Sequence, residues 1–326
     1  MIKPLPFSLL FSIVLLAAAS AQTPDTPTRT VKPVRATASV SQDPDDPAIW
    51  VNLRSPAQSV IIGTNKIEAS EGGALYVFGL DGKTRQIVPN LDRPNNVDVE
   101  YGMRLGAKKV DIAVCTERLQ HRLRIFAISS TGKLSDLAPQ GLPVFAGQTG
   151  DASEPMGIAL YKRPTDNEVF AIVGRKGGER KNYLHVYRLH DDGAGKPKAT
   201  LVKAFGAYSG KKEVESVCVD DALGYIYYSD ETVGVRKYPA NPDSPYFGQE
   251  LATFGREPGR VADHEGLAVY TRPDGTGYIV STDQIPVKDG GTRYYLYKRE
   301  GEPGDRHNHA EAVLIVSGGA DETDGV

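Results

Sequence analysis

A short motif recurs six times along the chain, and it limits the possible folds more than any other feature. Each copy has an anchor residue, acidic in four of the six cases, and an apolar strand-like run follows the first five anchors. The anchors are Asp46, Asn96, Met156, Glu215, Glu265 and Asp324. Successive anchors lie about 50 to 60 residues apart, which is the period of a β-propeller blade rather than of a helical repeat. The spacing therefore predicts a β-propeller.

Between the anchors, short apolar runs alternate with turn signals. The run at residues 75–78 ends at Asp81-Gly82, and residues 224–230 follow the same pattern as residues 277–283. Such runs are typical of β-strands joined by hairpins. No window has a sustained apolar stripe at helical spacing, so we expect no helix in the mature chain. The sequence predicts an all-β fold.

The N-terminus has the features of a secretory leader. One basic residue, Lys3, precedes a short apolar run that ends at Ala19-Ser20-Ala21. A transmembrane anchor is the alternative, but residues 7–21 are too few to span a membrane comfortably. We expect a signal peptide at 1–21, a flexible Thr- and Pro-rich lead-in at 22–38, and one domain at 39–326. The mature protein is then secreted or periplasmic.

Charge and cysteine content exclude some classes of protein. The formal net charge is −3, which gives no support for nucleic-acid binding. The two cysteines, Cys115 and Cys218, lie in strand-like runs of different repeat units. A propeller holds such strands farther apart than the roughly 7 Å that a disulfide allows between Cα atoms. We therefore expect buried free thiols without a redox role.

The first anchor lies in a cluster of carboxylates. Asp43, Asp45 and Asp46 fall within four residues, and Pro44 and Pro47 stiffen the segment. Carboxylates this close repel one another unless a cation lies among them. The cluster suggests a hard metal ion with oxygen ligands, such as Ca2+. A solvated acidic turn is the alternative.

Three repeat units place a cation directly after an apolar strand. The cations are Lys66, Arg118 and the pair Arg175-Lys176. Successive blades of a propeller point equivalent strand ends toward one mouth of the central channel, so these cations and the acidic anchors are expected to meet there. Such a mixture suits a polyanion that a divalent metal bridges to the protein. Scattered surface charge is the alternative.

Several catalytic motifs are missing. The six histidines form no H-E-x-x-H pair and no Arg-His-Gly motif, and no G-x-S-x-G sequence occurs. His264, between Asp263 and Glu265, is expected to be structural or to support a neighbouring ligand rather than to bind a metal itself. Water activated by a metal ion is the chemistry that remains.

Taken together, these motifs resemble those of the β-propeller phytases, the alkaline calcium-dependent family. The likeness runs from about residue 38 to the last residue. It is carried by residues 43–50, Thr64-Asn65-Lys66, Asn95-Asn96-Val97-Asp98, residues 154–161, Asp263-His264-Glu265-Gly266 and Thr323-Asp324-Gly325. The resemblance implies a six-bladed propeller that hydrolyses phosphate monoesters of myo-inositol hexakisphosphate, a phosphoric monoester hydrolase of the 3-phytase type. It also implies calcium ions that bridge carboxylates to substrate phosphates and supply the attacking water.

The resemblance assigns roles to individual residues. As calcium ligands or water-positioning groups it implies Asp45, Asp46, Asp98, Glu215, Asp263, Glu265, Gln284 and Asp324. As phosphate-binding cations it implies Lys66, Arg118 and Lys176, with Arg175 as a further contact. Glu215 and Glu265 are expected nearest the attacked phosphorus, so they join the three main cations as the catalytic set. Asp230 and Glu231 are a weaker match to the same mouth.

The chain departs from the family pattern in three places. Better-known members have a tyrosine at the position of Met156 and a glutamate at that of Gly177. The chain also stops at Val326, where the sixth repeat unit begins, so we expect a sixth blade that is incomplete. Incomplete closure would leave unpaired strand edges on the flanking blades.

Three functions are therefore compared. The first is a secreted calcium-dependent phytase that acts as a monomer on phytate, with no membrane contact after leader cleavage. The second is a non-catalytic propeller that binds inositol phosphates or a protein partner, motivated by Met156, Gly177 and the missing end of the sixth unit. The third is a calcium-dependent propeller esterase or lactonase, which has less need of the three cations.

Overall fold

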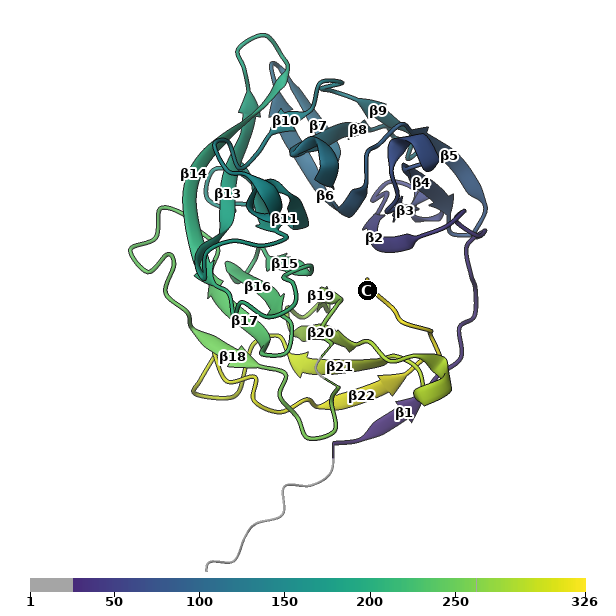
Figure 1. Ribbon diagram of the computed structural model, residues 1–326, viewed down its shortest axis with the longest axis vertical. Coiled ribbons are helices and arrows are strands. Elements are labelled where there is room, and N and C mark those ends of the chain that lie inside the picture. Colours follow the sequence, from purple (N-terminus) through teal and green to yellow (C-terminus); the bar gives the residue numbers. More distant parts are fainter. Residues whose placement is uncertain (1–25, 262) are drawn as a thin grey trace, which may run out of the picture.

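Five β-sheets stand around a common centre (Figure 1). The computed structural model describes residues 26–261 and 263–326, so the expected leader and the start of the lead-in lie outside the described residues. Within the described part, no helix is long and apolar enough to cross a membrane. The prediction of an all-β propeller is confirmed.

Each of the first three sheets is formed by consecutive strands, and we number these blades in chain order. Blade 1 comprises β2 (Pro44–Trp50), β3 (Val60–Asn65), β4 (Ala74–Gly79) and β5 (Thr84–Pro89). Blade 2 comprises β6 (Pro94–Leu105), β7 (Lys108–Glu117), β8 (Arg122–Ile128), β9 (Leu134–Asp136) and β10 (Leu142–Pro143). Blade 3 comprises β11 (Pro155–Lys162), β12 (Val169–Arg175), β13 (Lys181–Asp191) and β14 (Pro197–Ala207).

The last two blades follow the same order, and the fifth also takes in the first strand of the chain. Blade 4 comprises β15 (Val217–Asp220), β16 (Tyr225–Asp230), β17 (Gly234–Pro239) and β18 (Ala252–Phe254). Blade 5 comprises β19 (Leu267–Thr271), β20 (Gly277–Asp283), β21 (Arg293–Lys298), β22 (Leu314–Ser317) and β1 (Thr28–Thr30), which pairs with β22 in parallel.

The only helices in the described residues are single turns of 3₁₀ helix in the connections, in agreement with the absence of helical periodicity. They are η1 (Pro56–Gln58), η2 (Ala69–Glu71), η3 (Arg118–Gln120), η4 (Gly150–Ser153) and η5 (Val287–Asp289).

Apolar cores between neighbouring blades hold the ring together. Alternate residues of β3, such as Val60 and Ile62, turn toward blade 2 and pack in one buried cluster with Ala113 and Phe126. Three further clusters join blades 2 and 3, blades 3 and 4, and blades 4 and 5. Because one face of each sheet is apolar, burying it against the next sheet is the main stabilising contribution.

The expectation of six blades is wrong for the described residues, which form five sheets. The described residues at and after the sixth anchor, Asp324 to Val326, form no strand. The sixth repeat nevertheless occupies its place near the centre, where the chain ends (Figure 1). A Cβ at Gly325 would lie 2.1 Å from Cδ of Pro47, and a Cβ at Gly266 would lie 3.1 Å from C of Gly325. The last residues thus lie between the start of blade 5 and the start of blade 1.

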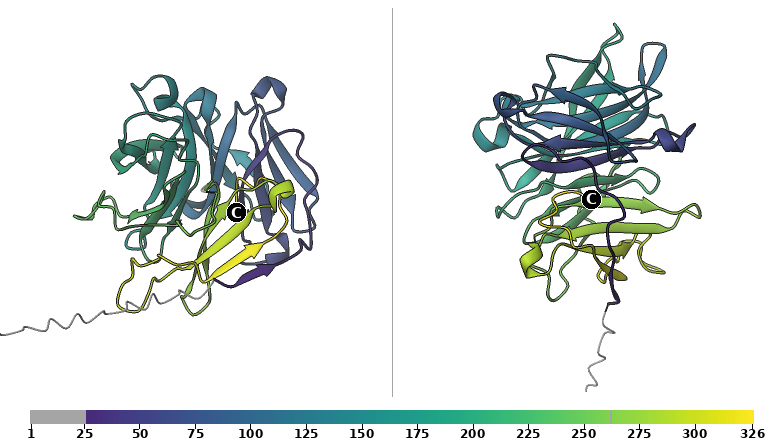
Figure 2. Two further views of the ribbon diagram at one scale, coloured as in Figure 1. Left: turned by 60° about the horizontal axis from the view of Figure 1, so that its bottom comes forward. Right: turned by 90° about the vertical axis from the view of Figure 1, so that its right-hand side faces the viewer.

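The N-terminal segment makes a second connection between these blades, on the outside of the ring. After β1 the chain crosses to blade 1 (Figure 2), where the Ala38 backbone N–H donates to the carbonyl oxygen of Gly82 over 2.7 Å. β1 also covers the outer edge of β22, which would otherwise be unpaired.

Both cysteines are free thiols, as expected. Cys115 is buried in the core between blades 1 and 2. Cys218 is only partly buried, because β15 is an innermost strand and this residue lines the central channel.

Candidate active site

A cluster of cations and carboxylates lies at one mouth of the channel. The ammonium of Lys66 forms ion pairs with Asp45 and, at 3.4 Å, with Oε1 of Glu215. The guanidinium of Arg118 lies 3.8 Å from the same oxygen. These four residues come from blades 1, 2 and 4, so the predicted meeting of charges from different blades is observed.

Strand direction explains why they meet. The innermost strand of each blade begins at this mouth, and its antiparallel neighbour ends there. Lys66 directly follows β3, Arg118 begins η3 directly after β7, and Glu215 lies two residues before β15. The backbone N–H of Lys66 donates to the carbonyl oxygen of Asp43 over 2.8 Å, which ties the end of β3 to the acidic turn before β2.

Asn95 links the charges of blades 2 and 4. Its Nδ2 donates hydrogen bonds to Oε1 of Glu215 at 2.5 Å and to Oδ1 of Asn96 at 2.7 Å. Its Oδ1 accepts a hydrogen bond from Arg118. Asn95 is fully buried, so these contacts hold its amide in one orientation.

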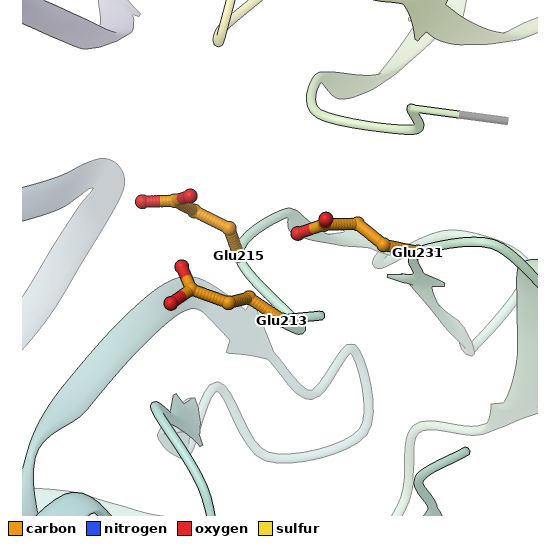
Figure 3. A group of neighbouring side chains, drawn as sticks. All are labelled: Glu213, Glu215 and Glu231. Carbon is orange, nitrogen blue, oxygen red and sulfur yellow. The ribbon is translucent and has the colours of Figure 1, made fainter. Parts of the chain in front are cut away.

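Beside this cluster, three glutamates form a carboxylate group. Two of them precede β15, and the third directly follows β16. Glu213, Glu215 and Glu231 each offer an oxygen, and these oxygens lie within 4.8 Å of one another. In Figure 3 the carboxylates of Glu213 and Glu215 point to the same side, and that of Glu231 points toward Glu215. Glu213 and Glu215 share a side of an extended segment because they are two residues apart.

A second carboxylate group continues the first toward blade 5. It consists of Glu231, Asp263 and Glu265, with oxygens again within 4.8 Å of one another. Lys212 pairs with Asp263 and, at 3.7 Å, with Glu231. Glu231 therefore belongs to both groups and connects them.

The C-terminal residues complete the same mouth. Nε2 of Gln284 donates to Oδ1 of Asp324 over 2.6 Å. Lys66 and Glu215 both affect the pKa of Asp324, which burial raises to about 6. Gln284 and Asp324 therefore lie beside the charges of Lys66 and Glu215.

Asp46 and Asp98 lie in the channel wall, where they join neighbouring blades. Oδ2 of Asp46 accepts a hydrogen bond of 2.9 Å from the backbone N–H of Val97 on β6. Oδ2 of Asp98 accepts a hydrogen bond of 2.7 Å from the backbone N–H of Leu160 on β11. Oδ1 of Asp98 accepts a hydrogen bond from the backbone N–H of Val99. These carboxylates thus act as acceptors between innermost strands, and both oxygens of Asp98 are engaged in this way.

The two cations after β12 have different surroundings. Lys176 lies 3.6 Å from Glu213, at the edge of the first carboxylate group. The guanidinium of Arg175 is 5.5 Å from the ring centre of Phe145 and 5.4 Å from that of Tyr183. It also donates to the carbonyl oxygen of Asn182 and is buried. Arg175 therefore does not join the other cations, because its side chain packs between aromatic rings.

The departures from the family pattern have structural explanations. The Met156 side chain is fully buried, and its carbonyl oxygen accepts a hydrogen bond of 2.8 Å from Thr116. At Gly177 an added Cβ would lie 2.9 Å from Cβ of Asp151, whose own side chain occupies the space.

Two neighbours of the predicted ligands are structural. Asp230 is buried and paired with Arg236 at 2.8 Å, so only Glu231 of that pair joins the carboxylates. His264 is buried, with its Nε2 2.7 Å from the carbonyl oxygen of Gly255.

Burial and mutual repulsion shift the pKa values of these acids upward. Burial, followed by repulsion from Asp263, raises the pKa of Glu231 to about 8. Burial, with repulsion from Glu231 and Glu215, raises that of Glu265 to about 10. Burial also raises the pKa of Asp46 to about 8 and that of Asp98 to about 7. Without a bound cation, Glu231 and Glu265 therefore keep their protons at neutral pH.

The pKa of Lys66 is set by its neighbouring carboxylates rather than by burial. Burial alone would lower its pKa, but the carboxylates of Asp45 and Glu215 outweigh this effect and raise it. Lys66 therefore stays protonated across the ordinary pH range, as a cation that binds phosphate must.

The carboxylate groups fit a calcium ion. Calcium takes about six to eight oxygen ligands at about 2.3–2.6 Å, so ligands on opposite sides of one ion lie roughly 5 Å apart. The oxygens of each group lie within 4.8 Å of one another. In addition, Oε2 of Glu265 is buried and has no hydrogen-bond partner among the described residues. A buried carboxylate oxygen without a partner is costly, and a cation would satisfy it.

Three residues of the cluster were not predicted from the sequence as site residues. Asn95 lies in a motif that carries the resemblance, but its role depends on Glu215 in another blade. Glu213 was detectable from its spacing of two residues to Glu215. Lys212 has no such signal, because its partners Glu231 and Asp263 lie far along the chain.

Comparison with known proteins identifies the family of the chain. The model of the family described as Phytase matches residues 7–326. A 3-phytase of Bacillus subtilis (strain 168) is 30% identical over 291 residues, which cover 86% of this chain and 69% of the relative.

Among solved structures, the chain matches proteins of low sequence identity. A protein from Lactobacillus plantarum is 12% identical, with a TM-score of 0.47, over 85% of this chain and 88% of that one. A protein from Bacteroides uniformis ATCC 8492 is 14% identical, also with a TM-score of 0.47, over 79% of this chain and 68% of that one. The family match extends over the propeller and all the residues of the channel mouth, and the chain belongs to the phytase family.

Proposed function

We propose that this protein is a calcium-dependent phytase that removes phosphate from myo-inositol hexakisphosphate by attack of water. The observation that carries the proposal is the convergence of Lys66 and Arg118, from blades 1 and 2, on Glu215 of blade 4. Cations and carboxylates held together at one mouth suit a substrate whose many negative charges need both direct and metal-mediated contacts.

Two sets of carboxylates are proposed to hold calcium. Glu213, Glu215 and Glu231 form one, and Glu231, Asp263 and Glu265 form the other, with Asp45, Gln284 and Asp324 beside them. When bound, calcium supplies charge neutralisation for the phosphates and lowers the pKa of water.

The chain's own residues have the remaining tasks. Lys66 and Arg118 bind phosphate oxygens, with Lys176 at the edge of the site. Asn95 holds the Glu215 carboxylate in place, and the fixed cations stabilise charge that develops on the phosphate. Because Lys66 and Arg118 are bound to carboxylates of different blades, they are positioned before substrate arrives.

The test is phosphate release from phytate by the purified protein. We expect release to stop when a chelator removes calcium and to return when calcium is added in excess. Release that ignores the chelator would contradict the metal mechanism. Binding of phytate by calorimetry without release would instead favour the non-catalytic alternative.

A lactonase is the other alternative, and it differs in its need for cations. Hydrolysis measured with phytate and an uncharged lactone in competition distinguishes a phytase from a lactonase. Lys66→Ala should abolish turnover of phytate, whereas an uncharged ester would be hydrolysed at an unchanged rate by a lactonase.

We propose secretion on the features of residues 1–21, and we propose that the active form is a monomer. N-terminal sequencing of the exported protein is expected to begin at Gln22. An intact N-terminus on protein found outside the cytoplasm would contradict cleavage at this site.

A further inference from the structure

The second carboxylate group already has a cation of the chain against it. The ammonium of Lys212 pairs with Asp263 and lies 3.7 Å from Oε2 of Glu231. Together with Glu265, these two residues offer the oxygens that lie within 4.8 Å of one another. An internal cation thus contacts two of the three side chains that a metal ion would use.

The loop before β15 holds Lys212 in this position. Lys212 has a left-handed backbone with φ of 50°, which is unfavourable for a residue other than glycine. Hydrogen bonds offset this cost: the hydroxyl of Tyr208 donates to the carbonyl oxygen of Lys212, and the hydroxyl of Ser209 donates to Oδ1 of Asp230 at 2.7 Å. The loop is therefore tied to the lysine's own carbonyl and, just before the lysine, to blade 4.

One ammonium does not balance the charge of this group. Oε2 of Glu265 remains buried without a hydrogen-bond partner among the residues that the structure describes. Lys212 carries a single charge, whereas the three carboxylates together can carry three. A divalent cation would contact all three side chains and neutralise more charge.

We propose that Lys212 is a built-in counter-ion that competes with a divalent metal for Glu231, Asp263 and Glu265, and that it thereby lowers the metal affinity of this group. The inference rests on the proposed function, since it concerns the same carboxylates. The Lys212 side chain is 48% exposed, so the ammonium can move into solvent without disturbing the core. Repulsion between like charges drives it away when the metal binds.

The exchange has a consequence for binding. With Lys212 in place the metal-free group is partly neutralised, which reduces repulsion among its carboxylates. The metal must displace an ion pair in order to bind, so the observed affinity is weaker than that of the bare carboxylates. Removing the ammonium should therefore strengthen calcium binding at this group.

The test is calorimetric titration of the metal-free protein with calcium. Lys212→Met keeps the length of the side chain and removes its charge. Lys211→Met is the matched control, because it removes the same charge from the adjacent residue, which makes no ion pair among the described residues. We expect Lys212→Met to bind calcium about tenfold more tightly at one class of site, and Lys211→Met to stay within about twofold of the wild type.

A second readout follows the amine itself. In carbon-resolved NMR spectra of the wild type, the ε-methylene signal of Lys212 is assigned as the one that is missing from the Lys212→Met variant. We expect this signal to shift as calcium is added, and we expect the ε-methylene signal of Lys211 to stay in place. A Lys212 signal that does not move while calcium binds would overturn the inference. Equal calcium affinity in the wild type and Lys212→Met would overturn it as well.

The outcomes separate this inference from the proposed function. If the wild type binds calcium and releases phosphate only with calcium, but Lys212→Met binds with unchanged affinity, only the counter-ion role fails. If neither the wild type nor Lys212→Met binds calcium, the calcium-dependent function fails and the counter-ion role with it. Thermal melting of both variants checks that the fold is retained.

Discussion

Nδ2 of Asn95 donates a hydrogen bond of 2.5 Å to Oε1 of Glu215, a residue 120 positions farther along the chain. The same oxygen lies 3.4 Å from Lys66 and 3.8 Å from Arg118. One carboxylate oxygen therefore collects three donors from two other blades. Its position depends on the closed ring rather than on any local segment.

The contact between Asn95 and Glu215 leads to the first prediction. Asn95→Asp keeps the shape of the side chain but replaces the donor with an oxygen that faces Glu215. We expect phosphate release from phytate to fall at least about tenfold, because the Glu215 carboxylate loses its orientation and gains a repulsive neighbour. Steady-state release, together with circular dichroism to check the fold, measures the effect. A wild-type rate would mean that Asn95 does not position Glu215.

The second prediction concerns the charges of the site. Lys66→Ala and Glu265→Gln should each reduce turnover by about 10²-fold or more, the usual cost of losing one group that stabilises developing charge. Lys83→Ala is the control, because Lys83 lies on an exposed hairpin and its ion pair to Asp81 is long, at 3.8 Å. Turnover and melting temperature are measured for all three. Normal turnover in both site variants would place the active site elsewhere.

A third prediction follows from the raised pKa values. The folded pKa values of Asp46 (about 8) and Glu265 (about 10) lie above the ordinary values of 3.8 and 4.5. The folded, metal-free protein therefore binds protons that the unfolded chain has already lost at neutral pH. The stability from these groups is complete below about pH 4 and is lost as the pH rises toward their folded values. Between pH 6.5 and 8 we expect the melting temperature of the metal-free protein to fall.

Calcium should reverse this trend by taking the place of the protons. Calorimetry at pH 7.5 in buffers of different ionisation enthalpy is expected to reveal proton release on calcium binding. Asp46→Asn and Glu265→Gln should each flatten the pH dependence of the metal-free melting temperature. Calcium binding without proton release would contradict the assignment of protonated carboxyls.

The fourth prediction concerns close packing behind the site. A Cβ at Gly157 would lie 2.0 Å from the carbonyl oxygen of Glu215, so Gly157→Ala must push this segment aside. We expect a loss of roughly 1–3 kcal/mol in the free energy of unfolding, together with lower turnover. Gly63→Ala is the matched control, since its Cβ would meet only Cε2 of Phe78 at an ordinary 3.8 Å. Denaturant unfolding compares the two, and equal stabilities would show that the backbone yields without cost.

The sequence by itself determined the repeating unit and which end of its strands carries the charged residues. The spacing of the six anchors and the alternation of apolar residues predicted an all-β propeller, and the position of charges at strand ends predicted that Lys66, Arg118 and Glu215 would meet. These signals are local: a period along the chain, a strand, and the residue at which it ends. Equivalent residues of repeated units are brought to one mouth whatever the details of packing.

Only the tertiary structure decided what each side chain meets across the ring. It placed Asp46 and Asp98 as acceptors between innermost strands, packed Arg175 against aromatic rings, and brought Lys212 to Asp263. It also showed five sheets, with Gly325 against Pro47 where the sixth repeat begins. These outcomes depend on contacts between blades, and a strand pattern specifies which face a residue is on but not its partner from a distant segment.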